Sequence, residues 1–235
     1  MQLERILQKH GFGTRKGCRS LIRHGRVAIG GVVCDDPFAE IETEGLVFTV
    51  DGADWPYAEF ACLMLHKPAG YECSRKPQHH PSVLTLLPLQ LRERDVQPVG
   101  LLDEDTTGLL LITDDGQLNH VLSSARRKVP KVYLATTRHP LEQAQVDQLL
   151  AGVQLNDEPE PVAAAACEIA GERSLRLTLT SGKYHQVKRM VAAAGNRVDA
   201  LHREAVGDLV LPGDLKPGEW RWLSAVDLQK LGYSR

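Results

Sequence analysis

Beyond residue 60 the sequence alternates short strand-like runs with helical stretches, and this order constrains the fold more than any other feature. The strand-like runs occupy residues 60–66, 109–113, 132–136 and 175–180. The helical stretches occupy residues 117–123, 141–151 and 184–194. Because the two types do not follow one another in strict strand–helix–strand units, the pattern predicts an α+β domain built on a mixed, largely antiparallel sheet.

The first 26 residues are strongly basic, although the whole chain carries a formal net charge of −2. They contain seven lysines and arginines and a single acid, Glu4, so the remainder of the chain is acidic overall. A basic end on an otherwise acidic protein indicates a local patch for a polyanion rather than a uniformly basic surface.

The basic residues of this segment are expected to share one face of a helix. Thr14 is a suitable N-cap, and Arg15, Arg19 and Arg23 then recur every four residues with Lys16 beside them. No acid is interleaved, and like charges at this spacing destabilise a helix unless a ligand neutralises them. The stripe therefore indicates RNA or phosphate binding, and the alternative is a solvated helix face.

Residues 1–35 also resemble the S4-type RNA-binding module. The resembling stretches are Leu3-Glu4-Arg5-Ile6-Leu7, Gly13-Thr14-Arg15-Lys16, residues 21–27 and Gly31-Val32-Val33. The resemblance implies binding to structured RNA through shape and phosphate contacts. We expect the RNA contacts at Arg5, Arg15, Lys16, Arg19, Arg23 and Arg26. The expected domains are an S4-like module over 1–45, a linker over 46–59 and a second domain over 60–235.

Three segments of the second domain place reactive side chains beside glycines and turns. In the first, residues 99–111, Asp103 lies in an acidic turn between apolar residues and a strand. An acid held at the edge of a core can act as a nucleophile or a general base. A plain turn, whose aspartates cap backbone amides, fits the same spacing.

The second segment, residues 131–137, is a strand in which Tyr133 alternates with apolar neighbours. An inward-facing tyrosine offers a surface for stacking a base, although a core tyrosine gives the same pattern. The third segment, residues 181–190, turns at Gly182 into a helix on which Lys188 adjoins the buried face. Such a lysine can pair with a carboxylate and keep it ionised. The alternative is a basic solvated helix, and in either case we expect RNA contacts from Lys183, His185 and Arg189.

Together the three segments resemble the pseudouridine synthases, in particular the branch that acts on small-subunit (16S) ribosomal RNA. Further resembling stretches are residues 65–71, 80–84, 201–204 and 218–221. The resemblance implies that Asp103 is the essential aspartate, Tyr133 the active-site tyrosine and Lys188 the basic partner of that aspartate. One position departs from the family pattern. Leu101 stands where the family usually has an arginine that helps to occupy the space left by the flipped base.

The implied reaction moves uracil from an N-glycosidic to a C-glycosidic bond and needs no cofactor or metal. The sequence agrees with this expectation, because it contains no nucleotide-binding glycine loop and no metal-spaced His/Cys cluster. A methyltransferase or a zinc deaminase is therefore disfavoured. The five scattered cysteines indicate reduced thiols.

With no signal-peptide or membrane-span pattern in the sequence, we expect a cytoplasmic monomer that meets 16S rRNA or a small-subunit assembly intermediate. Two alternatives remain open. One is a synthase acting on large-subunit rRNA, and the other is a noncatalytic RNA-binding protein of ribosome assembly on the same scaffold.

Overall fold

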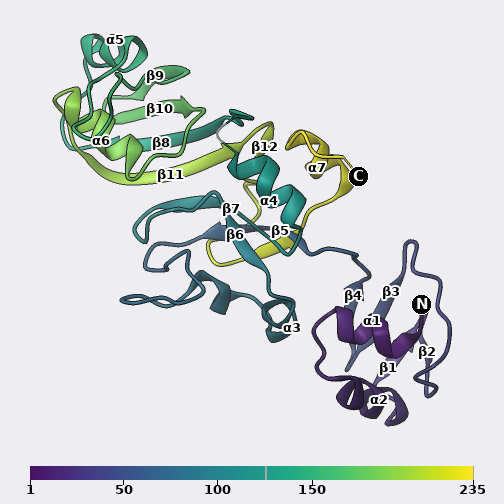
Figure 1. Ribbon diagram of the computed structural model, residues 1–235. Coiled ribbons are helices and arrows are strands. Elements are labelled where there is room, and N and C mark those ends of the chain that lie inside the picture. The colour runs from purple at the N-terminus through teal and green to yellow at the C-terminus, as the bar shows by residue number, and fades with distance from the viewer. Residues whose placement is uncertain (125, 235) are drawn as a thin grey trace. The chain divides into compact units, whose positions relative to one another are not determined.

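The computed structural model describes residues 1–124 and 126–234, and the chain forms two compact units (Figure 1). The first unit comprises Met1–Ala61 together with Leu87–Gln97, and the second comprises Cys62–Leu86 together with Pro98–Arg235. None of the helices in the described residues combines the length and the apolar character that crossing a membrane requires.

The first unit packs helices on a small antiparallel sheet. Its helices are α1 (Leu3–Lys9), α2 (Arg15–Arg23) and α3 (Leu89–Glu93). Its strands, in sheet order β2-β1-β3-β4, are β2 (Val32–Val33), β1 (Val27–Ile29), β3 (Val47–Val50) and β4 (Ala53–Pro56). Thr14 caps α2 as expected, since its Oγ1 accepts a hydrogen bond from Gly17 N at 3.2 Å. The apolar faces of α1 and α2 close over Phe48 and Val50.

Residues 46–59 were expected to form a linker, but in the structure they carry β3 and β4 of this sheet. The two strands pair from Val47↔Pro56 to Val50↔Ala53, across a turn at Asp51-Gly52. Both turn residues have positive φ, 51° and 81°, which is the backbone of a two-residue type I′ hairpin. The compact unit accordingly extends to Ala61 rather than ending at residue 45.

The second unit is built on a nine-stranded mixed sheet whose main path runs β13-β5-β7-β11-β8-β10-β9. Along this path only the β7·β11 pair is parallel, so the predicted α+β class with a largely antiparallel sheet is confirmed. The strands are β5 (Cys62–Lys67), β6 (Gln97–Val99), β7 (Thr107–Thr113), β8 (Lys131–Thr137), β9 (Ala166–Gly171), β10 (Ser174–Leu179), β11 (Val198–Val206), β12 (Leu209–Val210) and β13 (Trp220–Trp222). Strands β5 and β7 are buried over nearly their whole length, which explains their continuous apolar runs.

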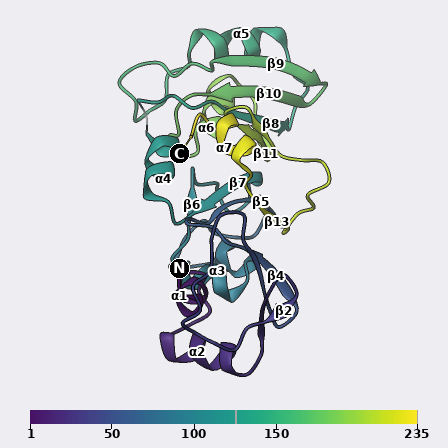
Figure 2. The same cartoon turned by 90° about the vertical axis from the view of Figure 1, so that its right-hand side faces the viewer.

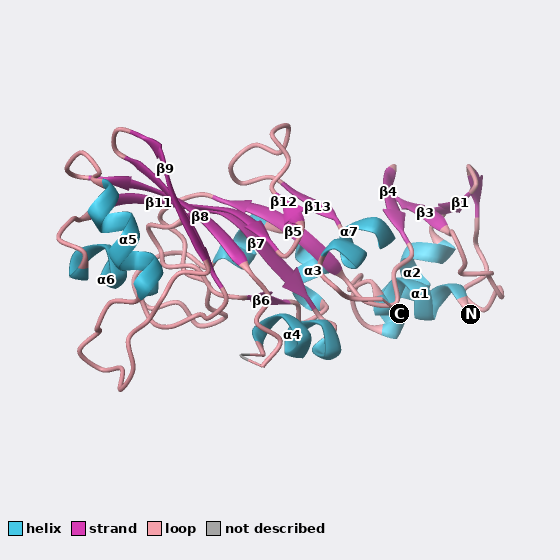
Figure 3. Ribbon diagram, turned by 90° about the horizontal axis from the view of Figure 1, so that it is seen from above, coloured by secondary structure: helices cyan, strands magenta, loops and turns pink. Residues whose placement is uncertain are grey.

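Helices α5 (Gln143–Ala151) and α6 (Gln186–Ala193) lie side by side at one end of this sheet (Figure 3). Helix α5 lies beside the outer strand β9 (Figure 2). Buried residues of both helices, such as Leu149 and Met190, pack against Leu175 and Leu177 of β10. The remaining helices of this unit are the 3₁₀ helix η1 (Val83–Leu86), α4 (Gly116–Ser123) and α7 (Ala225–Lys230). This packing fixes α6 at that end of the sheet, where it also contacts β11.

One glycine allows the two parallel strands to approach closely at the centre of the sheet. Gly108 of β7 lies opposite Arg203 of β11, and its φ is 110°. A Cβ atom at this position would lie only 2.3 Å from Arg203 O and 2.6 Å from Arg203 N. Only glycine combines this backbone conformation with this spacing.

Candidate active site

The second unit contains a cavity of about 670 Å³, which lies within the size range of small-molecule sites. Three of the segments that line it carry reactive side chains. The loop between β6 and β7 contributes Asp103, β8 contributes Tyr133, and the turn before α6 together with the start of that helix contributes residues 181–187. These are the three segments that the sequence singled out for their reactive side chains.

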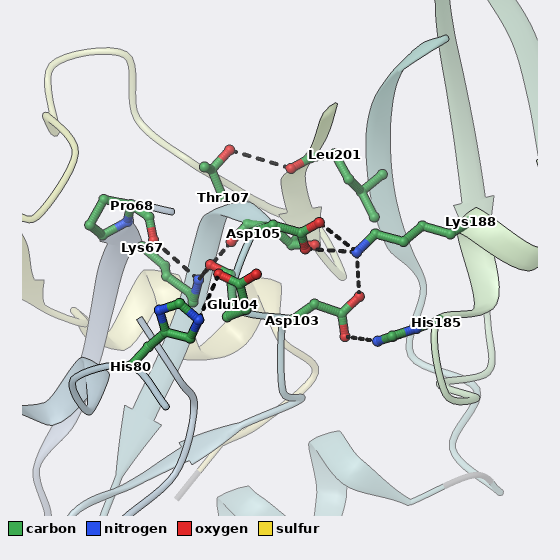
Figure 4. A network of polar contacts seen from close by, with 11 residues as sticks. Lys67, Pro68, His80, Asp103, Glu104, Asp105, Thr107, His185, Lys188 and Leu201 are labelled. Atoms are coloured by element: carbon green, nitrogen blue, oxygen red, sulfur yellow. Dashed lines mark hydrogen bonds and ion pairs between the residues drawn. The ribbon is translucent and has the colours of Figure 1, made fainter. Parts of the chain in front are cut away.

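Asp103 is held at this cavity by two basic side chains (Figure 4). Lys188 Nζ lies 3.1 Å from Asp103 Oδ2, and His185 Nε2 lies 3.4 Å from Asp103 Oδ1. The Asp103 side chain is 28% exposed. The carboxylate is therefore partly desolvated yet still accessible from the cavity, as a reacting group must be.

Lys188 bridges two carboxylates of the same loop. Its Nζ also donates to both oxygens of Asp105, at 2.7 and 2.9 Å. Burial alone would lower the pKa of Lys188, but its hydrogen bonds to Asp105 and Asp103 raise that pKa above the usual value. Burial likewise opposes ionisation of Asp105, but the hydrogen bond and the charge of Lys188, together with smaller contributions from the backbone and His185, lower the Asp105 pKa. The lysine is thus held as a cation beside the two acids.

Tyr133 lies at the middle of β8, half-buried, where it lines the cavity and packs against the core of the second unit. In the sheet it stands opposite Leu177 of β10 and Arg203 of β11. Asp103, Tyr133 and the Lys188 side chain that holds Asp103 are therefore brought together from positions far apart in the chain.

Comparisons with known proteins decide the family. Residues 61–193 match the family described as RNA pseudouridylate synthase, and residues 1–42 match the S4 domain. This chain belongs to the RNA pseudouridylate synthase family. The resemblances inferred from the sequence motifs are confirmed.

Curated relatives of this pseudouridylate synthase family member align over nearly its full length. The "Ribosomal small subunit pseudouridine synthase A" of Salmonella typhimurium is 43% identical over 235 residues, which are 99% of this chain and 100% of the relative. The protein of the same name from Vibrio cholerae is 36% identical, over 98% of this chain and 99% of the relative. A solved pseudouridylate synthase is 34% identical, with a TM-score of 0.70, and covers 98% of this chain and 99% of that one.

Lys67 fixes the loop that carries Asp103 and Asp105 through hydrogen bonds to its backbone carbonyl groups. This lysine is fully buried, and its Nζ donates to Pro68 O at 3.1 Å, Glu104 O at 2.9 Å and Thr106 O at 2.8 Å. Burial lowers its pKa. No role was predicted for Lys67 from the sequence, although a lysine that ends an apolar run just before a Pro-Ala-Gly turn is a signal for such a position.

Leu101 is 65% exposed and also lines the cavity. The departure from the family arginine therefore lies at the cavity itself, two residues before Asp103. An apolar side chain in this position offers no charged contact to RNA.

The basic residues of the first unit differ in their partners. Arg19 forms an ion pair with the buried Glu4 of α1 and lies over the Phe38 ring, and Arg26 pairs with Asp51 at 2.6 Å. No acid is interleaved in α2 itself, but at Arg19 the neutralising acid comes from the neighbouring helix α1. Arg15 donates to Gln8 Oε1 at 3.3 Å. Within residues 1–124 and 126–234, no ion pair is formed by Arg5, Lys16 and Arg23.

The three basic residues expected to bind RNA near α6 also have defined neighbours. Lys183 and Arg189 form ion pairs with Glu158 and Asp157, respectively, which lie in the loop after α5. His185 adopts a left-handed backbone with φ 45°, faces Asp103, and stacks on the exposed ring of Tyr184 with ring centroids 3.8 Å apart. The RNA-binding roles of these residues stay predictions.

Proposed function

We propose that this protein converts a uridine of small-subunit (16S) rRNA into pseudouridine, with Asp103 as the reacting carboxylate. The observation that carries the proposal is the position of Asp103. It borders a cavity large enough for a nucleotide, between two basic side chains and in company with Tyr133. The names of the full-length relatives support the small-subunit substrate.

In the proposed reaction the bond between ribose C1′ and uracil N1 breaks, and a bond between C1′ and C5 replaces it. The proton of C5 is lost and N1 gains one, so no electrons are added or removed. Asp103 acts as the nucleophile or as the base that starts the cleavage. Lys188 holds that carboxylate in place, and Tyr133 stacks on the uracil and assists removal of the C5 proton.

The target base must leave its stack to reach Asp103, which costs a few kilocalories per mole that other RNA contacts must offset. We assign those contacts to the first unit, where Arg5, Lys16 and Arg23 keep their charges unpaired by acids in the described residues. The proposed partner is 16S rRNA or an assembly intermediate of the small subunit, met by a monomer in the cytoplasm.

Two aspartates of one loop provide a matched test. Asp103 and Asp105 both pair with Lys188 Nζ, but only Asp103 borders the cavity. Tritium release from small-subunit rRNA labelled at uridine C5 measures turnover. Asp103→Asn should lower the rate at least about 1,000-fold with RNA affinity retained. Asp105→Asn removes an acid that is 57% exposed and leaves Lys188 paired with Asp103, so it should cost no more than about fivefold.

Near wild-type release by Asp103→Asn would refute its role, and the reverse order of the two variants would make Asp105 the reacting group. If the wild-type protein binds the RNA tightly but releases no tritium, the chain is a noncatalytic RNA-binding protein. Release from large-subunit rRNA alone would refute the small-subunit assignment.

A further inference from the structure

Two buried polar atoms of the second unit lack partners, and both belong to residues of the same cavity. Among the described residues, Thr106 Oγ1 and Arg203 Nη2 are the buried side-chain nitrogen or oxygen atoms with no hydrogen bond. Each residue is only 1% exposed, and each lines the cavity beside Asp103. Buried donors and acceptors are nearly always paired, so two orphans at one cavity point to a ligand that completes them.

The Arg203 side chain is held in place by the backbone around it. Its Nε donates to Leu109 O at 2.8 Å, and the absence of a side chain at Gly108 lets β11 approach β7 at this point. Gly100, in the loop that leads to Asp103, lies against the same guanidinium, because a Cβ there would be 3.6 Å from Nη1. The Nε edge of the guanidinium is thus hydrogen-bonded to the protein, and Nη2 remains available to a ligand in the cavity.

No acid neutralises this arginine in the part of the chain that the structure describes. Its positive charge also affects the pKa of a neighbouring residue that lines the cavity. Burial lowers the pKa of Lys131, and the positive charge of Arg203 lowers it further. A buried cation without a counter-ion is costly, so the site favours a ligand that presents acceptor oxygens or negative charge.

The base of the proposed substrate has this chemistry. Uracil presents two carbonyl oxygens, O2 and O4, on either side of the N3–H donor, whereas cytosine carries an amino group in place of O4. A guanidinium only donates hydrogen bonds, while a threonine hydroxyl both donates and accepts. When the C1′–N1 bond breaks, its electron pair stays on the base and spreads over N1, O2 and O4, which strengthens any hydrogen bond to those oxygens.

We propose that Arg203 and Thr106 read the flipped-out base, with Arg203 Nη2 donating to a uracil carbonyl oxygen and Thr106 Oγ1 bonding a neighbouring polar atom of the same edge. This inference rests on the proposed function and extends it. It adds two residues that contact the base and determine specificity to the proposed catalytic set of Asp103, Tyr133 and Lys188.

The test combines protein variants with altered bases in the target RNA. Single-turnover rates are measured on RNA that carries uridine, 2-thiouridine or 4-thiouridine at the modified position, because sulfur accepts hydrogen bonds poorly. One thio-substitution should slow the wild-type protein about 10- to 100-fold, which identifies the oxygen that is read. Arg203→Gln should slow the reaction of uridine by a similar factor and should lose most of its sensitivity to that same thio-substitution.

Thr106→Val guards against a variant that fails to fold. It keeps the shape of threonine and removes an unpaired buried hydroxyl, so a purely structural role predicts unchanged or higher thermal stability with normal turnover. The proposal likewise predicts unchanged or higher thermal stability in Thr106→Val, but with turnover lowered about tenfold. Arg176→Gln is the matched arginine control, since Arg176 lies on β10, pairs with Glu204 and Glu168, and does not line the cavity.

A readout without turnover separates this inference from the proposed function. In the Asp103→Asn background, RNA with uridine at the target position should bind about tenfold more tightly than RNA with cytidine, and adding Arg203→Gln should abolish the preference. Two results overturn the proposal even if the wild-type protein makes pseudouridine. One is equal binding of uridine and cytidine RNA by the Asp103→Asn single variant, and the other is a rate loss on thio-substituted RNA that is as large in Arg203→Gln as in the wild-type protein. An inactive wild-type protein that still prefers uridine would refute only the proposed function.

Discussion

Replacing Lys188 with methionine removes the cation that bridges Asp103 and Asp105 while keeping most of the apolar side chain. The Nζ atom lies 3.1 Å from Asp103 Oδ2. At this distance the attraction is about 1.3 kcal/mol in bulk water and about 5 kcal/mol at an effective dielectric constant of 20. Both side chains are about one-quarter exposed, 25% and 28%. We therefore expect a loss of about 2–3 kcal/mol in the transition state, or roughly 30- to 150-fold in rate.

The same variant should change the pH dependence. In the wild-type protein the pKa of Asp105 lies below its usual value, because burial raises it but the hydrogen bond and charge of Lys188 are among the opposing effects that together lower it. Without the lysine the two carboxylates face each other, and repulsion between like charges favours protonation of one of them. The acid limb of the pH–rate profile should therefore move to higher pH in Lys188→Met.

The assay is the single-turnover rate at saturating RNA, with affinity measured separately by filter binding. Lys230→Met is the matched control, since Lys230 pairs with Asp227 on α7 and does not line the cavity. It should leave rate and affinity at the wild-type values. An unchanged rate in Lys188→Met, or a loss confined to RNA affinity, would show that the Lys188 cation beside Asp103 has no part in the reaction.

Two further predictions concern the first unit. Arg23→Gln should weaken RNA binding and reduce the slope of log affinity against log salt by about one, whereas Arg19→Gln should chiefly lower the melting temperature, because it leaves the buried Glu4 without its partner. Equal salt slopes for Arg23→Gln and wild type would place Arg23 outside the RNA interface. His10 accepts a hydrogen bond from Ala58 N, and burial lowers its pKa to about 4. Because its unfolded pKa is near 6.5, folding stability should be lost as pH falls from 6.5 to 4, by about 3 kcal/mol in all. NMR titration of the ring checks this, and a midpoint near 6.5 would contradict it.

The fold followed from local patterns where those patterns were strong. The continuous apolar runs of β5 and β7, the alternation in β8 and the Thr14 cap all predict the elements that the structure contains. The assignment of residues 46–59 to a linker missed a signal that was present. Asp51-Gly52 between two strand-like segments is a typical type I′ hairpin, and its β4 strand completes the first sheet.

The site depended on information that no local pattern carries. Asp103 and Lys188 are 85 positions apart, and only the family resemblance linked them before the structure brought their side chains together. The burial of Lys67 and Arg203 could not be foreseen, because charged side chains in strands are usually exposed. Their placement follows from the sheet order, in which Gly108 allows β7 and β11 to meet.

The measurement that tests the account most directly is a map of pseudouridines in small-subunit rRNA from cells that lack this protein. We predict that one pseudouridine is missing, that the wild-type gene restores it, and that the Asp103→Asn gene does not. A map identical to that of the parent cells, or restoration by Asp103→Asn, would contradict the account.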